Sequence, residues 1–349
     1  MKEAGLTSTL NRLRLPLILG VVLIHCDILD YMDSAEPGLA VFGGFMRVMN
    51  VLFGLCVPMF FFISGYFFFR DGLLTRQLYL GSVKSRWHTL IIPYLAWNLI
   101  GLAAVGIKSL PPLATHFPQY EGAFSSVWSV LRGFYCQAHV PYPYDFPLWF
   151  LRDLIVLVVF APVISFAFRL LRQYFVAVYA VVIVLLPCLP TIVHSSCFFF
   201  VLGATVSIYR IRVAAKYLRP LATTLLYGAL VVASFYVSGP LMRLGRCLVG
   251  ILWLISLSAW LGRTDKGPNK ALMPMVFFIY ACHGLYSSVV TKGTVMLMTP
   301  EDSSLLAFCA YFTAFAVNMA ITLSLYAVGR RCFPRVVTVL TGNRNPVLP

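Results

Sequence analysis

The chain has 349 residues, of which 60% are hydrophobic and 11% charged, and its formal net charge is +15. Soluble domains carry roughly 25% charged residues, so this composition excludes an ordinary soluble protein. The mean hydropathy is +0.85, and apolar runs recur from one end of the sequence to the other. A transmembrane β-barrel would show alternating segments of about ten residues. We therefore predict an all-α, polytopic integral membrane bundle.

Ten membrane helices are predicted within a single transmembrane domain, 1–349, with the N- and C-termini in the cytoplasm. Their approximate ranges are 12–32, 41–69, 87–108, 148–169, 174–190, 195–209, 219–237, 244–262, 272–296 and 304–330. In this topology most Lys and Arg residues fall at cytoplasmic ends and most acidic residues on the outer side, which is the positive-inside pattern. The excess positive charge therefore indicates orientation in the membrane, and we expect no nucleic-acid partner.

The first apolar run, "RLRLPLILGVVLIHCDILD" (12–30), carries ionisable residues that a span would take into the membrane, where they are costly and indicate function. On a helix, Arg14 and His25 lie about 20° past three full turns and about 16 Å apart along the axis. One face would then present Arg14 near the cytosol to bind phosphate and His25 deeper for proton transfer. The alternative is an arginine that snorkels to the headgroups and a histidine hydrogen-bonded within the bundle.

One long outer loop is predicted at about residues 109–147. Its segment "FSSVWSVLRGFY" places Phe124, Val127, Trp128, Leu131 and Tyr135 on one helical stripe. That stripe predicts a short amphipathic helix at the outer membrane interface. The next segment, "HVPYPYDFPLWF", is rich in proline and aromatic residues. An interfacial aromatic belt and a surface that stacks sugar rings are both open interpretations of it.

Arg47 and Asn50 share a helix face near the outer end of the second predicted helix. They either pair with Asp27 or Asp30 of the first helix or bind an acceptor substrate. Nine cysteines are scattered through the chain without a C-x-x-C pair, so we expect no metal site and no disulfide framework. The sequence also lacks a Walker motif and a Gly-rich dinucleotide fingerprint, and we expect no permanently bound cofactor.

Two further groups of polar residues lie late in the predicted outer loop and late in the chain. Arg152 and Asp153 enter the fourth predicted helix from outside, beside Trp149, and are candidates for binding the acceptor. Tyr280 and His283 are three residues apart and so share one face of the ninth predicted helix. They are candidates for hydrogen-bonding an acyl carbonyl or for orienting a catalytic base. Simple packing within the bundle is the alternative.

Four stretches accompany the Arg14–His25 spacing in a fixed order. They are "PMFFFISGYFFF" (58–69), "RWHTLIIPYLAWN" (86–98), "LWFLRDLIVL" (148–157) and "FFIYACHGL" (277–285). Together with that spacing they resemble the membrane acyltransferase 3 family over the whole length of the chain. The resemblance implies transfer of an acyl group, usually acetyl, from cytosolic acyl-CoA to a sugar hydroxyl of an envelope glycan or lipid-linked sugar. It also implies a multi-pass protein of the bacterial inner membrane.

In this resemblance Arg14 and His25 match the family's essential pair, and Arg86 matches the first arginine of a basic motif. The family often has a second arginine three positions later, where this chain has Thr89, so Lys84 or His88 would have to substitute. We expect no hydrolase-like domain after the bundle, although the resemblance implies that some relatives carry one.

The predicted donor site lies at the cytoplasmic mouth, where positive charge attracts the phosphates of coenzyme A. The residues expected to bind the donor are Arg14, Arg86, Lys84, Arg76 and Ser64. His25 would deprotonate the acceptor hydroxyl, which attacks the thioester directly. A secondary transporter or glycan flippase is the alternative function, since it would also need polar residues within the membrane. A non-catalytic assembly subunit is a third.

Overall fold

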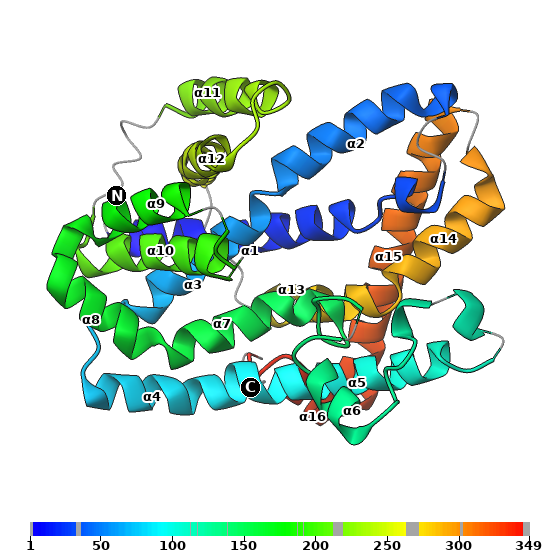
Figure 1. The fold of residues 1–349 in the computed structure, drawn as a ribbon, viewed down its shortest axis with the longest axis horizontal. Coiled ribbons are helices and arrows are strands. Elements are labelled where there is room, and N and C mark those ends of the chain that lie inside the picture. Colours follow the sequence, from blue (N-terminus) through cyan, green and yellow to red (C-terminus); the bar gives the residue numbers. More distant parts are fainter. Residues whose placement is uncertain are drawn as a thin grey trace. The chain divides into compact units, whose positions relative to one another are not determined.

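The computed structural model describes residues 3–32, 36–111, 113–116, 118–137, 139–186, 188–190, 192–211, 219–262, 272–300 and 303–344. These residues form helices and turns without a strand, in agreement with the all-α prediction (Figure 1). The α-helices are α1 (Glu3–Ile24), α2 (Ala40–Phe53), α3 (Cys56–Phe68), α4 (Arg76–Arg86), α5 (Ile92–Lys108), α6 (Val127–Gly133), α7 (Trp149–Val159), α8 (Ala161–Leu171), α9 (Phe175–Leu185), α10 (Phe198–Ile208), α11 (Pro220–Ala233), α12 (Pro240–Leu261), α13 (Leu272–Cys282), α14 (Ser287–Met298), α15 (Ser304–Cys332) and α16 (Pro334–Leu340).

Tighter or wider helical turns join several of these helices. The 3₁₀ turns are η1 (Leu29–Tyr31), η2 (Pro37–Leu39), η4 (Leu113–His116), η5 (Pro118–Tyr120), η6 (Phe146–Leu148), η7 (Arg172–Tyr174) and η9 (His283–Leu285), and the π-helical turns are η3 (Trp87–Ile91) and η8 (Ile192–Cys197). The π turns matter for the site because such turns are rare and occur frequently where a helix serves a function.

Five helical stretches in the described part of the chain are long and apolar enough to cross a membrane. They are Pro37–Phe68, Arg76–Lys108, Ala161–Leu185, Pro240–Leu261 and Ser304–Cys332. A sixth is added if Leu272–Leu285 and Ser287–Met298, which meet at an angle of 60°, are one broken span. The predicted count of ten is not confirmed, since apolar helices such as Pro220–Ala233 extend only about 21 Å against a hydrocarbon core of about 30 Å. The orientation of the termini stays a prediction.

Prolines explain where two predicted helices divide. The predicted helix 41–69 is interrupted after Phe53, and 148–169 after Val159. Pro58 lacks the N–H that would bond the carbonyl of residue 54, and Pro162 does the same to the carbonyl of residue 158. Pro93 likewise withdraws the donor from the carbonyl of Thr89, and here the helix continues through the π turn η3.

The first helix is longer at its start and shorter at its end than predicted. It covers Glu3–Ile24 instead of 12–32, so His25 lies just beyond its last residue. The amides of His25 and Cys26 bond the carbonyls of Val22 and Leu23, three residues back instead of four. This tightened turn ends the α-helical periodicity just before His25, and the projection of His25 from the helix face of Arg14 stays a prediction.

The predicted helix 272–296 is also broken, because its middle forms the 3₁₀ turn η9. His283 therefore lies in a 3₁₀ turn that follows α13, three residues before the bend at Tyr286, and its shared face with Tyr280 stays a prediction. The short helix expected in the outer loop is confirmed as α6, which begins at Ser126, whose hydroxyl accepts the amide N–H of Ser129. Its place at a membrane interface stays a prediction, and α16 was not predicted at all.

The chain divides into two compact units, each assembled from three stretches of sequence. Unit 1 comprises residues 1–21, 45–82 and 156–269. Its best-packed pair is α3 against α10, which approach so closely that a Cβ at Gly65 or Gly203 would overlap the backbone of the facing helix. Small residues permit this kind of close helix packing in membrane proteins. The single transmembrane domain predicted for 1–349 stays a prediction.

Unit 2 comprises residues 22–44, 83–155 and 270–349. Its centre is α15, which packs against α13, α14 and α16 (Figure 1). The helix α16 in turn packs against α5, and the short turn η6 packs against both α13 and η9. These contacts bring the end of the outer loop to the late segment of the chain that carries His283.

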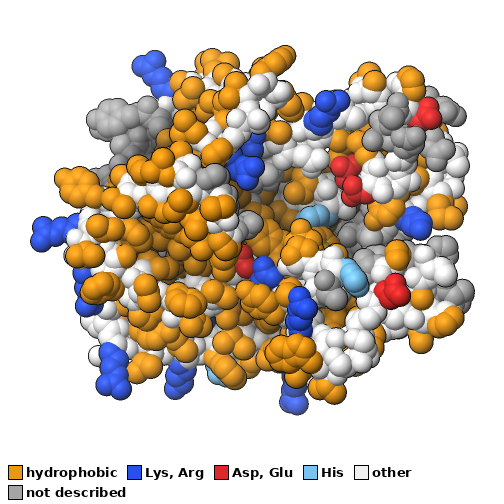
Figure 2. All heavy atoms as spheres, in the orientation of Figure 1, with side chains coloured by type: hydrophobic (Ala, Val, Ile, Leu, Met, Phe, Trp, Pro, Cys, Tyr) orange, Lys and Arg blue, Asp and Glu red, His pale blue; other side chains and the backbone are white. Residues whose placement is uncertain are grey.

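Hydrophobic side chains are exposed over much of the surface in Figure 2. Examples are Leu170 on α8 and Leu305 on α15, with 70% and 75% of their surface exposed. Monomeric soluble proteins rarely expose extensive apolar surface, whereas a surface that faces lipid must be apolar. The surface therefore agrees with the membrane assignment made from composition.

Candidate active site

Two histidines that are far apart in the sequence lie together in unit 2. The rings of His25 and His283 are stacked, with centroids 5.5 Å apart and an angle of 28° between their planes. Phe146 contacts both rings edge-on, at 4.8 Å from His25 and 6.2 Å from His283. His283 is fully buried and His25 is half-buried, so one imidazole of the pair is accessible.

The hydrogen bond of His283 defines which of its nitrogens is available for chemistry. Its Nδ1 lies 3.0 Å from the carbonyl oxygen of Ile279. A carbonyl only accepts, so Nδ1 carries the proton and a neutral ring then holds its lone pair on Nε2. This Nε2 is buried and has no hydrogen-bond partner in the part of the chain that the structure describes. A buried lone pair of this kind is costly unless it meets a donor, which a substrate can provide.

The turn η6 fixes Phe146 against the histidines. The hydroxyl of Tyr280 donates to the carbonyl oxygen of Pro147 at 2.7 Å, which joins α13 to this turn. A Cβ added at Gly284 would overlap the ring of Pro147, so only glycine permits the approach of η9 to η6. Tyr280 thus acts on the shape of the site through Pro147 instead of presenting a free hydroxyl.

Asp145, directly before this turn, is a buried carboxyl. It is 1% exposed, and neither of its carboxyl oxygens has a hydrogen-bond partner among the described residues. Its backbone N–H donates to Oδ1 of Asn98 on α5 at 3.4 Å. Burial raises the pKa of Asp145 well above its usual range, and the charge of Lys108 partly opposes that rise. Burial thus favours the neutral form of a carboxyl that directly precedes Phe146 and lies beside Gly284, next to the histidine pair.

Polar side chains of α15 hold the turn that carries His25. The Tyr311 hydroxyl donates to the carbonyl oxygen of Leu23 at 3.2 Å. Nδ2 of Asn318 donates to Sγ of Cys26 at 3.5 Å and to the carbonyl oxygen of Ala314 at 2.9 Å. His25 therefore lies between two residues that are tied to one helix, so α15 holds the turn that carries its ring.

The predicted acceptor-binding charges on α7 bind each other. Arg152 Nη2 lies 2.9 Å from Oδ1 of Asp153, which is 2% exposed. Arg152 also stacks over the ring of Tyr135 at 4.8 Å and donates to the carbonyl oxygens of Tyr135 and Pro141. The pair thus fixes the end of the outer loop, next to the half-buried Trp149.

The predicted donor-binding residues are divided between the two units. Arg14 and Ser64 belong to unit 1. The Arg14 guanidinium lies 5.3 Å from the centroid of the Phe67 ring, and the Ser64 hydroxyl donates to the carbonyl oxygen of Phe60 at 2.8 Å. Arg76, in the same unit, is exposed.

Lys84 and Arg86 belong to unit 2, where they end α4 just before the π turn η3. Lys84 is exposed and Arg86 is half-buried. Arg47 and Asn50 are exposed on the part of α2 that belongs to unit 1. Asp27, in unit 2, accepts the amide N–H of Leu29 at 3.0 Å and so stabilises the turn η1.

Phe146, Asp145 and Asn318 are site residues that sequence reasoning missed. The first two lie within "HVPYPYDFPLWF", where an acid between proline and aromatic residues was a usable signal. A carboxylate in so apolar a segment needs either solvent or a specific environment. Asn318 stands in the apolar run of α15, where a lone amide is a signal of the same kind.

The described residues form helices and turns, five or six stretches of them are long and apolar enough to cross a membrane, and these features define a multi-pass membrane protein. The chain belongs to the acyltransferase 3 family, since the family's acyltransferase domain matches residues 8–326. The protein is therefore a membrane acyltransferase. This membership favours the enzyme among the functions considered above over the transporter or flippase.

A curated relative extends the similarity over nearly the whole chain. The succinoglycan biosynthesis protein ExoH of Rhizobium meliloti (strain 1021) is 28% identical over an aligned length of 361 residues. The alignment covers 98% of this chain and 94% of that protein. No solved structure matches the chain. The relative's near-complete coverage shows that the similarity is not confined to a few apolar helices.

Proposed function

We propose that this protein transfers an acyl group, acetyl in the simplest case, from cytosolic acyl-CoA to a hydroxyl of an envelope polysaccharide or lipid-linked sugar. The family supports acyl transfer, and the relative named for succinoglycan biosynthesis supports a polysaccharide acceptor. The observation that carries the proposal is the stacked pair of His25 and His283, of which only His25 is accessible.

In the proposed reaction His25 is the general base. The acceptor oxygen forms a bond to the acyl carbonyl carbon, and the bond from that carbon to the CoA sulfur breaks. The hydroxyl proton passes to His25 and from there to the departing thiolate, so CoA leaves as a thiol and the imidazole is restored. The direct route needs no covalent acyl-enzyme, and Ser64, whose hydroxyl is engaged with Phe60, is not required as a nucleophile.

The other residues of unit 2 take positioning roles in this proposal. His283 keeps its proton on Nδ1 through Ile279, so its Nε2 can accept a hydrogen bond from the acceptor hydroxyl or from the protonated His25. Tyr280 holds Phe146 through Pro147, which closes one side of the pair. Arg14 is proposed to bind a donor phosphate, because a guanidinium remains charged and forms paired hydrogen bonds.

The proposal is tested by acyl transfer in purified protein reconstituted into lipid vesicles. Radiolabelled acetyl-CoA and succinyl-CoA would be offered as donors with an isolated envelope polysaccharide as acceptor. We expect His25→Gln to lower kcat by about 10²- to 10⁴-fold, the usual contribution of a general base. His139→Gln is the matched control, since His139 is exposed in the outer loop.

Two results would contradict the proposal. Transfer by folded His25→Gln at the wild-type rate would remove the base assignment. Wild-type vesicles that move a glycan precursor across the bilayer but consume no acyl-CoA would instead establish the flippase alternative. Thermal stabilisation by CoA, measured on the same preparations, separates these cases because a ligand stabilises only the protein that binds it.

A further inference from the structure

The C-terminal segment of the described chain is bound to the start of α5 by specific contacts. After α16, residues 341–344 turn back across the π turn η3 and the beginning of α5. Nε1 of Trp97 donates to the carbonyl oxygen of Leu340 at 2.9 Å. Gly342 is buried, has a φ of +65°, and lies so close to η3 that a Cβ there would be 2.7 Å from the carbonyl oxygen of Thr89. We call residues 334–344 the C-terminal strap.

Arg344, at the end of the strap, contacts the π turn directly. Its Nη2 donates to the carbonyl oxygen of Thr89 at 3.0 Å, and its Nη1 donates to that of Thr341 at 3.1 Å. Because Pro93 has no N–H, the helix cannot offer Thr89 its usual donor four residues on. The guanidinium supplies that donor, so its position follows from the local geometry of the helix.

The face of the guanidinium is held as well. It lies 4.0 Å from the centroid of the Phe277 ring on α13. A cation stacked on an aromatic ring keeps its N–H groups at its edge, and a guanidinium has five of them. The arrangement fixes the plane of Arg344 in a way that suits paired hydrogen bonds to a planar or tetrahedral anion.

Arg344 contacts the beginning of a helical stretch that is long enough to cross a membrane. The stretch from Trp87 to Lys108 is about 33 Å long, and a span of the hydrocarbon core that begins at Trp87 has its first turn at a membrane surface. Lys84 and Arg86 end the preceding helix within one to two turns of Thr89. Two cations, Lys84 and Arg86, therefore precede the π turn in the sequence. Within the turn, the backbone carbonyl of Thr89 accepts a hydrogen bond from Arg344.

We propose that Arg344 is a donor-binding residue and that, with Arg86, it binds the phosphate groups of acyl-CoA at the π turn η3. The proposal rests on the proposed function, which supplies acyl-CoA as the donor. The strap would thereby provide from the C-terminus the second guanidinium that the sequence lacks at Thr89. Phe277 lies on α13, and His283 directly follows the end of this helix, about 9 Å further along its axis. The helix α13 therefore connects the proposed phosphate site to the histidine pair.

The test compares two donors with the same thioester and pantetheine arm. Acetyl-CoA also carries the pyrophosphate and the adenosine 3′-phosphate, which S-acetyl-pantetheine lacks. For Arg344→Gln we expect the KM for acetyl-CoA to rise at least tenfold with kcat nearly unchanged, and the KM for S-acetyl-pantetheine to stay at the wild-type value. Arg344→Lys keeps the positive charge but lacks the planar guanidinium that forms paired hydrogen bonds, so it should give an intermediate KM for acetyl-CoA.

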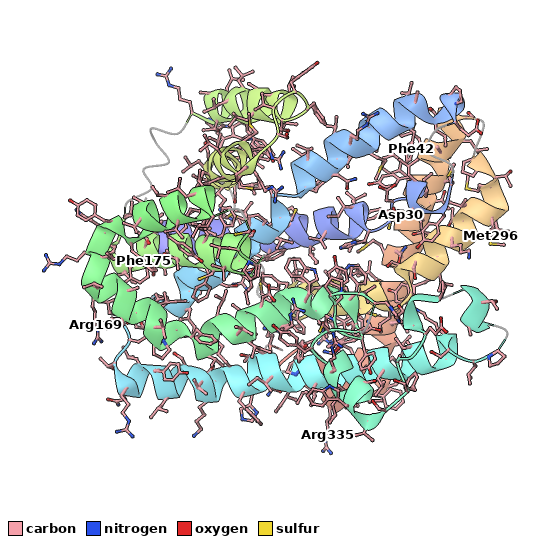
Figure 3. All side chains as sticks on the ribbon, viewed as in Figure 1. Asp30, Phe42, Arg169, Phe175, Met296 and Arg335 are labelled. Carbon is pink, nitrogen blue, oxygen red and sulfur yellow. The ribbon has the colours of Figure 1, made fainter. Side chains whose placement is uncertain are left out.

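Arg335→Gln is the matched control, because Arg335 is exposed on α16 of the same strap and points outward (Figure 3). It should leave both KM values unchanged. An unchanged KM for acetyl-CoA in Arg344→Gln would overturn the proposal, as would an equal loss with both donors, which indicates a structural role only. A protein that turns over neither donor in its wild-type form would instead overturn the proposed function.

An anionic lipid headgroup offers the same phosphate chemistry at a membrane surface. The comparison is therefore made in nanodiscs of purely zwitterionic lipid and in nanodiscs containing anionic lipid. If Arg344 binds acyl-CoA, the difference between wild type and Arg344→Gln persists in both. A difference confined to anionic nanodiscs would assign Arg344 to lipid and overturn the donor assignment.

Discussion

Removing one hydroxyl, in Tyr311→Phe, tests whether α15 positions the base. Tyr311 is fully buried, and its hydroxyl donates to the carbonyl oxygen of Leu23 at 3.2 Å, two residues before His25. That carbonyl also accepts the amide N–H of Cys26 at 3.1 Å, so the substitution leaves it with a partner. The loss of stability should be small, about 0.5–1.5 kcal/mol for one hydrogen bond.

The effect on catalysis should be much larger than the effect on stability. The tightened turn at His25 is tied to α15 through Leu23 and through Cys26, and losing one tie lets the imidazole shift. A displacement of about 1 Å at a catalytic group can lower the rate by about 10²-fold. We expect kcat for acetyl transfer to fall by about 10- to 100-fold, with an unchanged KM for acetyl-CoA.

Tyr227→Phe provides a closely matched control. Tyr227 is buried in unit 1, and its hydroxyl donates to the carbonyl oxygen of Leu52 at 3.1 Å. Both variants lose the same group from a bond of nearly the same length, so thermal unfolding in detergent should register similar losses. Only Tyr311→Phe should lower kcat. Equal kcat values in the two variants would refute the idea that α15 orients His25.

Two further predictions concern Asp145 and the strap. Burial raises the pKa of Asp145 in the folded protein above its value of about 4 in the unfolded chain, so this carboxyl stabilises the folded state at low pH. That stabilisation is lost as the pH rises from about 4 toward the raised pKa. Thermal midpoints measured between pH 5 and 8 should therefore fall less steeply in Asp145→Asn, and identical slopes would contradict the burial argument. Gly342→Ala places a Cβ 2.7 Å from the Thr89 carbonyl at a φ of +65°, so it should displace the strap, raise the KM for acetyl-CoA and expose the C-terminus to protease. Gly81→Ala, where a Cβ meets nothing within 4 Å, should cause none of these three effects.

The sequence was sufficient for the fold class, because composition alone requires helices in a membrane. It was less sufficient for helix boundaries. Hydropathy predicted 148–169 as one helix, although Pro162 divides it, and placed the start of another at 87, although the helix is continuous from Arg76. Apolar side chains do not distinguish a continuous helix from a broken one, whereas the carbonyl left without a donor by proline does.

The candidate site was predictable where single residues were unusual and not where a contact depended on two distant segments. His25 and His283 both stood out as ionisable groups in apolar runs. Nothing in their spacing, however, predicted that η6 and η9 would bring their rings together. Arg344 was missed for the same reason, since its position depends on how α16 packs against α5.

The end of α1 at Ile24 changes how the spacing of Arg14 and His25 is to be understood. If both residues lay on one regular helix, their relation would be set by helical periodicity, and the first helix would define the site. His25 instead follows the helix in a turn whose carbonyl at Leu23 and thiol at Cys26 are held by α15. The first helix therefore brings the chain to the site, and α15 holds the turn that carries the imidazole. A base positioned in this way depends on residues some 290 positions away in the sequence, which is why no motif in the first helix can specify it alone.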